Sequence, residues 1–301
     1  SDAFTGYGIT KDGDANLSYW YITPAIYDGE WHYYSNKNLD DLYIPKSDIK
    51  LEIEYPQGYH ITSELDLDEV LQSSNKQKVI FTGNDRISSK LYINKVKSFE
   101  TFENEKLALV TNIKDERLDL IDKVLSIEKV SNYILENLGN YPHKKLVISQ
   151  IDLDKEPVYG LNFLPKFIRT YPNNFNYELN LLKIGLQNYL ENTLLINPRK
   201  DQWLLDGIQM YFMIHYVKEN YPDMNFLGSI ANIWGIRSFH ASSLSYNDKY
   251  ILAYMLMART NRDQPLTMAK DSLLKFNKNI ANKYKAGIGF DYLDDFVNQN
   301  I

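Results

Sequence analysis

Alternation of apolar and polar residues over the first hundred positions predicts a series of short β-strands. In the clearest case Ile49, Leu51, Ile53 and Tyr55 alternate with charged residues, which is the two-residue period of a half-buried strand. Further extended segments are predicted at 59–62, 78–82 and 90–93, with a turn at 83–85. Several short strands separated by turns are typical of a β-sandwich or of part of one.

The pattern changes near residue 97, after which helical spacing dominates. Two more strands are predicted at 106–110 and 145–149, and a helix at 118–138 whose end is marked by Gly139. Further helices are predicted at 178–196, 202–220, 247–259, 266–284 and 289–298. The predicted fold class is α+β, with a partial, β-sandwich-like N-terminal domain over 1–97. The second domain, over 98–301, is mixed α/β at first and then mainly helical.

The composition of the 301 residues is that of a globular protein, with 44% hydrophobic and 24% charged residues. The formal charge of −6 includes no basic stripe that could neutralise phosphates, so a nucleic-acid partner is not expected. The longest apolar runs, such as 251–257, are too short to cross a membrane. The absence of cysteine excludes disulfides, thiolate catalysis and cysteine-ligated zinc.

The composition leaves the cellular compartment open, because many secreted bacterial proteins also lack cysteine. The sequence begins at Ser1 without methionine and without a basic and then apolar leader. A processed protein of the cell envelope, or of another extracytoplasmic compartment, would begin in this way, and so would an excised fragment.

The most specific sequence feature lies in the predicted helix at 202–220. Its first turns contain Trp203-Leu204-Leu205-Asp206-Gly207, followed by Tyr211. This segment resembles the Trp-Leu-Asn-Glu-Gly-Phe-x-x-Tyr helix of the aminopeptidase N-like zinc metallopeptidases, which are gluzincins with a thermolysin-like catalytic domain. In that family the helix supplies the third zinc ligand. The resemblance implies part of the family's β-domain followed by its thermolysin-like domain, with a helical domain expected beyond Ile301.

Other segments resemble the same family in the same order along the chain. They correspond to a late part of the β-domain, a strand pair, a strand entry and the segment whose tyrosine stabilises the oxyanion. These segments are 20–31, 49–62, 140–146 and 284–287, and the last contains Tyr284. The ordered set, rather than any one match, carries the resemblance.

The family places its zinc-binding helix one helix upstream of this motif. Two histidines one turn apart bind the metal there, and a glutamate beside the first acts as general base. Eighteen residues separate Asp206 from Gln187, and Lys183 lies one turn earlier with Ile184 beside it. The resemblance therefore implies that Lys183, Ile184 and Gln187 stand where a zinc peptidase has His, Glu and His. We expect no catalytic residue, no cofactor and no zinc.

Other side chains do not rebuild a metal site. No two of the five histidines are three or four residues apart. His215 and Glu219 share a helical face but are expected at the surface. The acidic residues at 64–69 and at 291–295 are also expected on a solvated surface.

Two arrangements remain open for the degenerate site formed by Lys183, Ile184, Gln187, Asp206 and Tyr284. In the first, the ammonium group of Lys183 replaces the lost cation and pairs with Asp206. This pair is either a structural contact between two helices or part of a pocket retained for binding, and Tyr284 lines the core or that pocket. In the second, the helix register differs and other residues line the cleft.

The predicted function is that of a catalytically inactive, metallopeptidase-like pseudoenzyme of the aminopeptidase N type. Such a protein would act as a binding or scaffolding module, with a peptide, protein or glycan in the former active-site cleft. The alternative is an active peptidase or other hydrolase with a rearranged or metal-independent site. These two functions differ in whether the protein binds zinc and in whether it cleaves aminopeptidase substrates.

Overall fold

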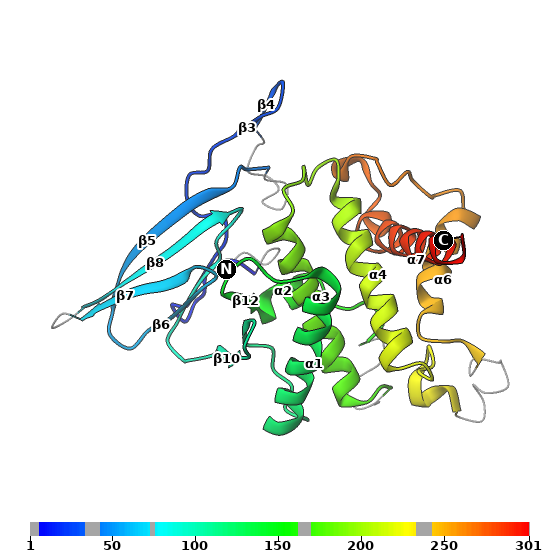
Figure 1. Ribbon diagram of the computed structural model, residues 1–301, viewed down its shortest axis with the longest axis horizontal. Helices are drawn as coiled ribbons and strands as arrows, with labels where there is room; N and C mark the ends of the chain where they lie inside the picture. The colour runs from blue at the N-terminus through cyan, green and yellow to red at the C-terminus, as the bar shows by residue number, and fades with distance from the viewer. Residues whose placement is uncertain (1–5, 34–42, 73–75, 162–169, 233–242, 301) are drawn as a thin grey trace. The chain divides into compact units, whose positions relative to one another are not determined.

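The structure is a computed structural model that describes residues 6–33, 43–72, 76–161, 170–232 and 243–300 (Figure 1). The chain divides into two compact units. The first unit is Ser1–Pro157 with Ile184–Leu195, and the second unit is Val158–Lys183 with Ile196–Ile301. The predicted α+β class is confirmed, since strands come first and the later part is mainly helical. None of the described helices is both long and apolar enough to cross a lipid bilayer.

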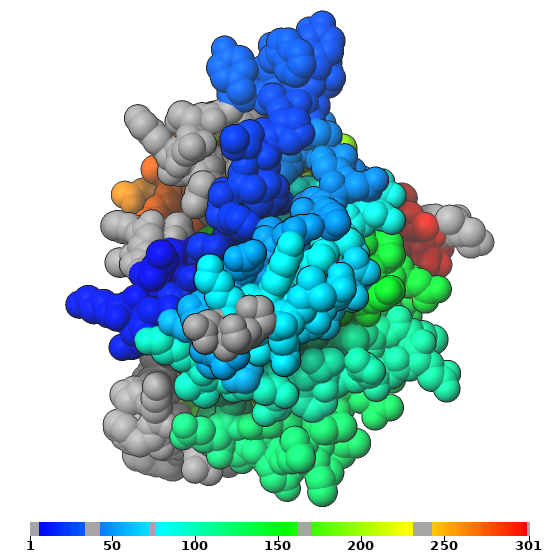
Figure 2. Space-filling view, turned by 90° about the vertical axis from the view of Figure 1, so that its left-hand side faces the viewer, coloured from blue at the N-terminus to red at the C-terminus, as the bar shows by residue number. Residues whose placement is uncertain are grey.

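The described strands all belong to the first unit, where they form sheets of two to four strands. The four-stranded sheet has the order β1 (Gly8–Ile9), β2 (Ala15–Leu17), β9 (Leu91–Asn94), β6 (His60–Ser63). One three-stranded sheet has the order β5 (Ser47–Pro56), β8 (Lys76–Arg86), β7 (Asp66–Gln72). The other has the order β10 (Glu100–Glu103), β11 (Ala108–Thr111), β12 (Lys145–Ile148). The hairpin of β3 (Ile26–Tyr27) and β4 (Trp31–His32) projects from these strands (Figure 2).

The strand predicted from alternation at 49–55 is confirmed. Along β5, exposed residues alternate with half-buried ones, and the apolar residues are the half-buried set. In the antiparallel register with β8, Leu51 lies opposite Phe81 and Ile53 lies opposite Val79. Phe81 and Val79 are buried together with Leu65, so this face of the sheet forms a small core.

Two predictions for this region are wrong. The turn expected at 83–85 does not form, because β8 continues to Arg86 opposite a register shift in β5. There Asp85 has a φ of 53° and donates its N–H to Oδ1 of Asp48 at 3.1 Å. The acidic run at 64–69 is not a loop, because β7 begins within it, although Asp68 and Glu69 are exposed as expected. Glu64 is buried and its Oε2 accepts the backbone N–H of Lys90 at 2.9 Å.

The first unit also contains α1 (Leu120–Leu138) and the short α2 (Gln150–Lys155). The helix predicted at 118–138 is confirmed, and both of its ends have the expected polar contacts. Asp119 accepts the N–H of Asp122 at 2.8 Å as the N-cap. Gly139 follows the last residue with a φ of 86°, and its N–H is bonded to the carbonyl of Leu135.

The second unit is built from helices. It contains α4 (Gln202–Asn220), η2 (Gly228–Asn232), α6 (Asp248–Arg259), η4 (Lys270–Ser272), η5 (Asn277–Ala281) and α7 (Asn282–Asn300). The helix α3 (Asn173–Thr193) contributes residues to both units and begins earlier than predicted. The helices predicted at 202–220 and 247–259 are confirmed as α4 and α6.

The helix predicted at 266–284 is wrong in its first half. Only the single turn η4 forms before Asn277, from which a π-helical turn leads directly into α7. The Nδ2 group of Asn277 donates to the carbonyl of Arg262 at 2.7 Å and to Oε1 of Gln264 at 2.8 Å. The same Oε1 accepts the N–H of Leu274 at 2.7 Å. Side-chain amides thus satisfy backbone groups that a helix would have paired, which favours the non-helical path.

The helices α4 and α7 approach each other closely at two glycines. A Cβ atom at Gly207 would lie 2.5 Å from a ring carbon of Phe290, and one at Gly287 would lie 2.4 Å from Cβ of Met210. No side chain fits at these separations, so the two glycines permit the observed packing of one helix on the other.

We expect the substitution Gly287→Ala to lower the free energy of unfolding by about 1–3 kcal/mol, because the new methyl group forces the helices apart. Gly289→Ala is the matched control on the same helix, since a Cβ atom there meets nothing within 4 Å. The control should raise stability by about 0.5–1 kcal/mol through reduced backbone entropy of the unfolded chain. Urea unfolding measures both, and an equal gain in the two variants would contradict the close contact.

Candidate functional site

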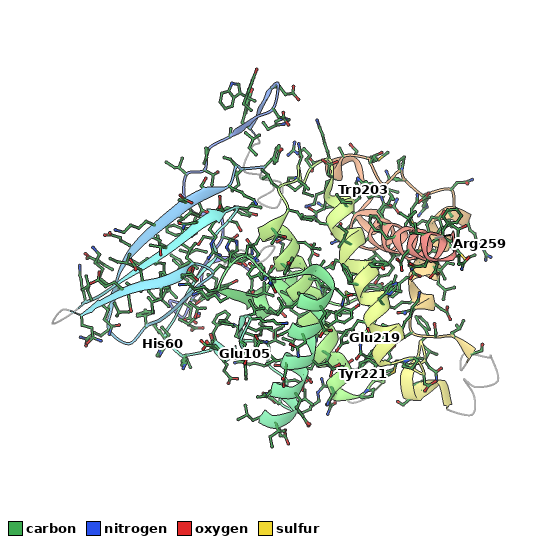
Figure 3. All side chains as sticks on the ribbon, viewed as in Figure 1. His60, Glu105, Trp203, Glu219, Tyr221 and Arg259 are labelled. Carbon is green, nitrogen blue, oxygen red and sulfur yellow. The ribbon has the colours of Figure 1, made fainter. Side chains whose placement is uncertain are left out.

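The structure forms both helices on which the degenerate zinc site was predicted. Lys183, Ile184 and Gln187 lie on α3, and Asp206 lies in the first turns of α4. Trp203 and Tyr221, labelled in Figure 3, lie near the start and just beyond the end of α4. Both helices therefore form as predicted, and the role of each predicted site residue on them follows from the contacts of its side chain.

Two of the predicted residues make contacts of a structural kind. Ile184, which the resemblance implies at the general-base position, is fully buried. A hydrocarbon side chain cannot accept a proton, so general-base chemistry is absent from this position. Gln187 donates from Nε2 to Oε1 of Glu191 at 2.9 Å, one turn later on the same helix.

The predicted pairing of Asp206 with Lys183 is wrong. The ion-pair partner of Asp206 among the described residues is Lys283, whose Nζ lies 3.3 Å from Oδ1. The same oxygen accepts a hydrogen bond from Gln202 at 3.2 Å. Lys283 is near the start of α7, one turn before Gly287. The close approach of α7 to α4 thus brings an ammonium group to Asp206 that is distant in sequence.

Lys183 lies instead near a second buried lysine, Lys249 of α6. Both side chains are about 8% exposed, and the positive charge of Lys183 disfavours protonation of Lys249. The backbone carbonyl of Lys183 accepts Nε2 of Gln209, on α4, at 2.7 Å. Gln209 therefore ties α3 to α4 at Lys183.

Lys249 is surrounded by aromatic rings rather than by acids. Its Nζ lies 3.6 Å from the ring centroid of Tyr246 and 4.9 Å from that of Tyr250, and it donates to the carbonyl of Tyr159 at 3.3 Å. No described carboxylate forms an ion pair with it. Burial, and then the charge of Lys183, lower the pKa of Lys249 well below its usual value.

Tyr284 belongs to the same surroundings. Its ring meets that of Tyr250 edge-on, with centroids 4.7 Å apart. Burial raises the pKa of its hydroxyl, and the nearby Tyr159 adds to the shift. We call Tyr159, Lys183, Tyr246, Lys249, Tyr250 and Tyr284 the lysine–tyrosine cluster. Of the predicted site residues, the structure brings Lys183 and Tyr284 into this cluster and places Asp206 in another contact.

The donors at these positions do not fit zinc. An ammonium group repels a metal cation, an amide oxygen is a weak zinc ligand, and Asp206 is already paired with Lys283. Across the described ranges, no three His, Asp or Glu side chains gather in a group that could hold a metal ion. His215, expected at the surface beside Glu219, is half-buried and bonded through Nε2 to Asp291 at 3.0 Å.

Sequence reasoning missed Lys249 because nothing distinguishes it from the surface lysines of an ordinary helix. It also missed a buried polar group in the first unit. There Asp152 accepts hydrogen bonds from Ser149 at 2.8 Å and Tyr7 at 2.8 Å and pairs with Lys90 at 2.9 Å. The signal for part of this group was present, since Ser149 and Asp152 have the spacing of a helix-capping box.

No protein-family model and no curated protein matches the chain. Among solved structures, it is similar to an M1 zinc metallopeptidase from Deinococcus radiodurans, with a TM-score of 0.47, 10% identity and coverage of 81% of this chain and 52% of that one. A mutant of that enzyme gives the same TM-score and identity over 80% of this chain. A two-domain M1 zinc metallopeptidase mutant bound to L-arginine has a TM-score of 0.38 and 12% identity, over 59% of this chain and 42% of its own. The chain spans about half the length of these structures.

Replacing Lys249 with methionine, a side chain of similar length, is expected to stabilise the protein at neutral pH. Because the pKa of Lys249 is lowered on folding, the unfolded chain binds this proton more readily than the folded protein does. The stability of the parent protein should therefore rise with pH toward the ordinary lysine pKa, by up to about 1.4 kcal/mol per pH unit. Chemical unfolding at a series of pH values from neutral upward should show this rise in the parent protein but not in Lys249→Met.

Lys285→Met is the control for this experiment. Lys285 also lies over a tyrosine ring, that of Tyr254 at 5.5 Å, but it has an acid partner, Asp263, at 2.7 Å. The control should not gain stability at neutral pH. A loss of stability in Lys249→Met would show instead that the ring contacts outweigh the cost of burial, and would contradict the prediction.

Proposed function

We propose that the chain is a zinc-free relative of the aminopeptidase N-like metallopeptidases that acts as a binding or scaffolding module. The observation that carries the proposal is the buried Lys249 beside Lys183, because the side chains of two lysines lie around a position where the resemblance implies a bound cation. The absence of a general base at Ile184 supports the same conclusion. The proposed catalytic inactivity is based on these side chains rather than on the resemblance itself.

The chemistry of the lysine–tyrosine cluster suits a carboxylate rather than a metal ion. Ammonium groups and tyrosine hydroxyls donate hydrogen bonds to anions, and such bonds are stronger when water is excluded. A peptide or protein segment that carries a carboxylate is therefore the partner that we propose for this site. The mutual repulsion of the two lysines would be relieved when such a group binds.

The alternative function, a hydrolase with a metal-independent site, is favoured by one observation. A lysine whose pKa is lowered by burial holds an unprotonated amine at lower pH than usual, and such an amine serves as a general base or a nucleophile in other enzymes. This function requires that the cluster be open to substrate and that Lys249 be essential for turnover.

Elemental analysis of the freshly purified protein, with an active zinc aminopeptidase purified in parallel, tests the proposal. We expect no stoichiometric zinc in this protein and no zinc-dependent rise in its melting temperature, because no group of side chains in the described part of the chain favours the metal. Stoichiometric zinc would contradict the proposal.

Fluorogenic aminopeptidase substrates distinguish the two functions. The binding function predicts no turnover above a buffer blank. Turnover that a chelator does not abolish and that is lost in Lys249→Met would establish the metal-independent hydrolase in place of the binding module. The Lys285→Met variant serves again as the control for unspecific effects of removing a lysine.

A further inference from the structure

The first unit contains a cleft of about 700 Å³ that the proposed function does not use. One wall is the apolar face of the three-stranded sheet, from which Val79 and Phe81 of β8 and Leu67 and Val70 of β7 face the space. Leu67 is 55% exposed and Val70 is 48% exposed, which is unusual for neighbouring aliphatic residues on a folded sheet. A cleft of this volume is in the range of known ligand sites.

The lining also includes the whole of β6. His60, labelled in Figure 3, and the three residues that follow it to Ser63 all line the cleft. Side chains of successive residues in a strand point to opposite faces of its sheet. Four successive residues can line one space only when the edge of the strand, with its backbone groups, faces that space.

This edge of β6 is unpaired among the described residues. β6 is the last strand of its sheet and pairs only with β9, in the register His60 with Asn94 through Ser63 with Leu91. Proteins commonly protect such edges with proline or lysine, and β6 contains neither. The cleft thus presents a row of backbone donors and acceptors together with an apolar surface.

The lining of the cleft includes a lysine that forms no ion pair with a described carboxylate. Lys145, the first residue of β12, is half-buried, and its Nζ lies 5.7 Å from the ring centroid of Phe81. No described carboxylate forms an ion pair with it, although Asp66 and Glu64 act on it from a distance. Burial lowers the pKa of Lys145, so a carboxylate placed beside the ammonium group would relieve a cost of folding.

The other charged groups lining the cleft are Lys97 and Glu103. With Lys145 there are two lysines and one glutamate, so the cleft has an excess of positive charge. The apolar wall suits apolar side chains, the free strand edge suits an extended backbone, and the lysine side chain suits a carboxylate. One kind of ligand, an extended peptide, has all three features.

We propose that this cleft binds an extended peptide, which adds a strand to the free edge of β6, packs apolar side chains on the exposed Leu67 and Val70, and places a carboxylate on Lys145. β6 is four residues long, so the bound strand covers about 13 Å. Alternate side chains of the peptide face the apolar wall, as in other cases of strand addition. The inference does not depend on the proposed function, since every residue in it belongs to the first unit.

Isothermal titration calorimetry with three synthetic peptides tests the proposal. The first is acetyl-Val-Thr-Val-Thr-Val with a free carboxylate, the second is its C-terminal amide, and the third carries N-methyl groups on alternate residues. We expect the carboxylate peptide to bind about tenfold more tightly than the amide, the difference expected from one charge-assisted contact. The N-methylated peptide should bind at least about tenfold more weakly than the unmodified carboxylate peptide, because it cannot form the strand hydrogen bonds.

Lys145→Met should abolish the preference for the carboxylate, so that acid and amide bind equally. Lys144→Met is the matched control, since Lys144 is exposed, precedes Lys145 and does not line the cleft. Melting temperatures of both variants separate a loss of binding from a loss of folding. Amide chemical shifts of Ile61 and Val79 should move on addition of the first peptide to the parent protein.

Two results would overturn the proposal. One is equal binding of the N-methylated and unmodified peptides, which would mean that the strand edge takes no part. The other is binding of dodecanoate at the same residues without binding of any peptide. That outcome would make the cleft a site for amphiphilic acids.

Discussion

The cost of burying a charge is the constraint that organises this protein, because a buried ion must find its partner within the fold. In the first unit, Lys90 satisfies this requirement with Asp152, and two hydroxyl groups complete the shell of the carboxylate. In the second unit, Asp206 pairs with Lys283, and both side chains are about nine-tenths buried. In both pairs the partners lie far apart in sequence, so the folding of each unit is what brings the charges together.

Two lysines depart from this rule, and they mark the two candidate sites. Lys249 lies among tyrosine rings, and Lys145 lies over Phe81, and neither forms an ion pair with a described carboxylate. Ring contacts recover only part of the lost hydration of an ammonium group. A protein that keeps such groups bears a stability cost that an anionic ligand would offset. The carboxylate proposed for each unit therefore rests on the same physical argument, although the two sites share no residue.

Local patterns in the sequence predicted those features of the fold that depend only on residues close together in the chain. The alternation in β5, the caps of α1 and the extent of α4 follow from residues within a few positions of one another. Contacts between distant residues were not predictable in this way. The pairing of Asp206 depends on how α7 packs, the irregular path before Asn277 depends on the amide of Gln264, and the burial of Glu64 depends on Lys90. Nothing in the local sequence distinguishes Lys249 or Lys145 from a lysine at the surface.

The resemblance of the Trp203 segment to a zinc-binding helix has a structural explanation that needs no metal. Trp203 stacks on Phe290 of α7, with ring centroids 6.3 Å apart and planes 11° from parallel. Gly207 lets the Phe290 ring come so close that a Cβ atom at this position would lie 2.5 Å from a ring carbon. Asp206 pairs with Lys283, which is also on α7. Each of these positions is therefore held by contact with α7. These contacts use side chains of α4 and α7 alone, so packing between the two helices is sufficient to account for Trp203, Asp206 and Gly207 without any bound metal.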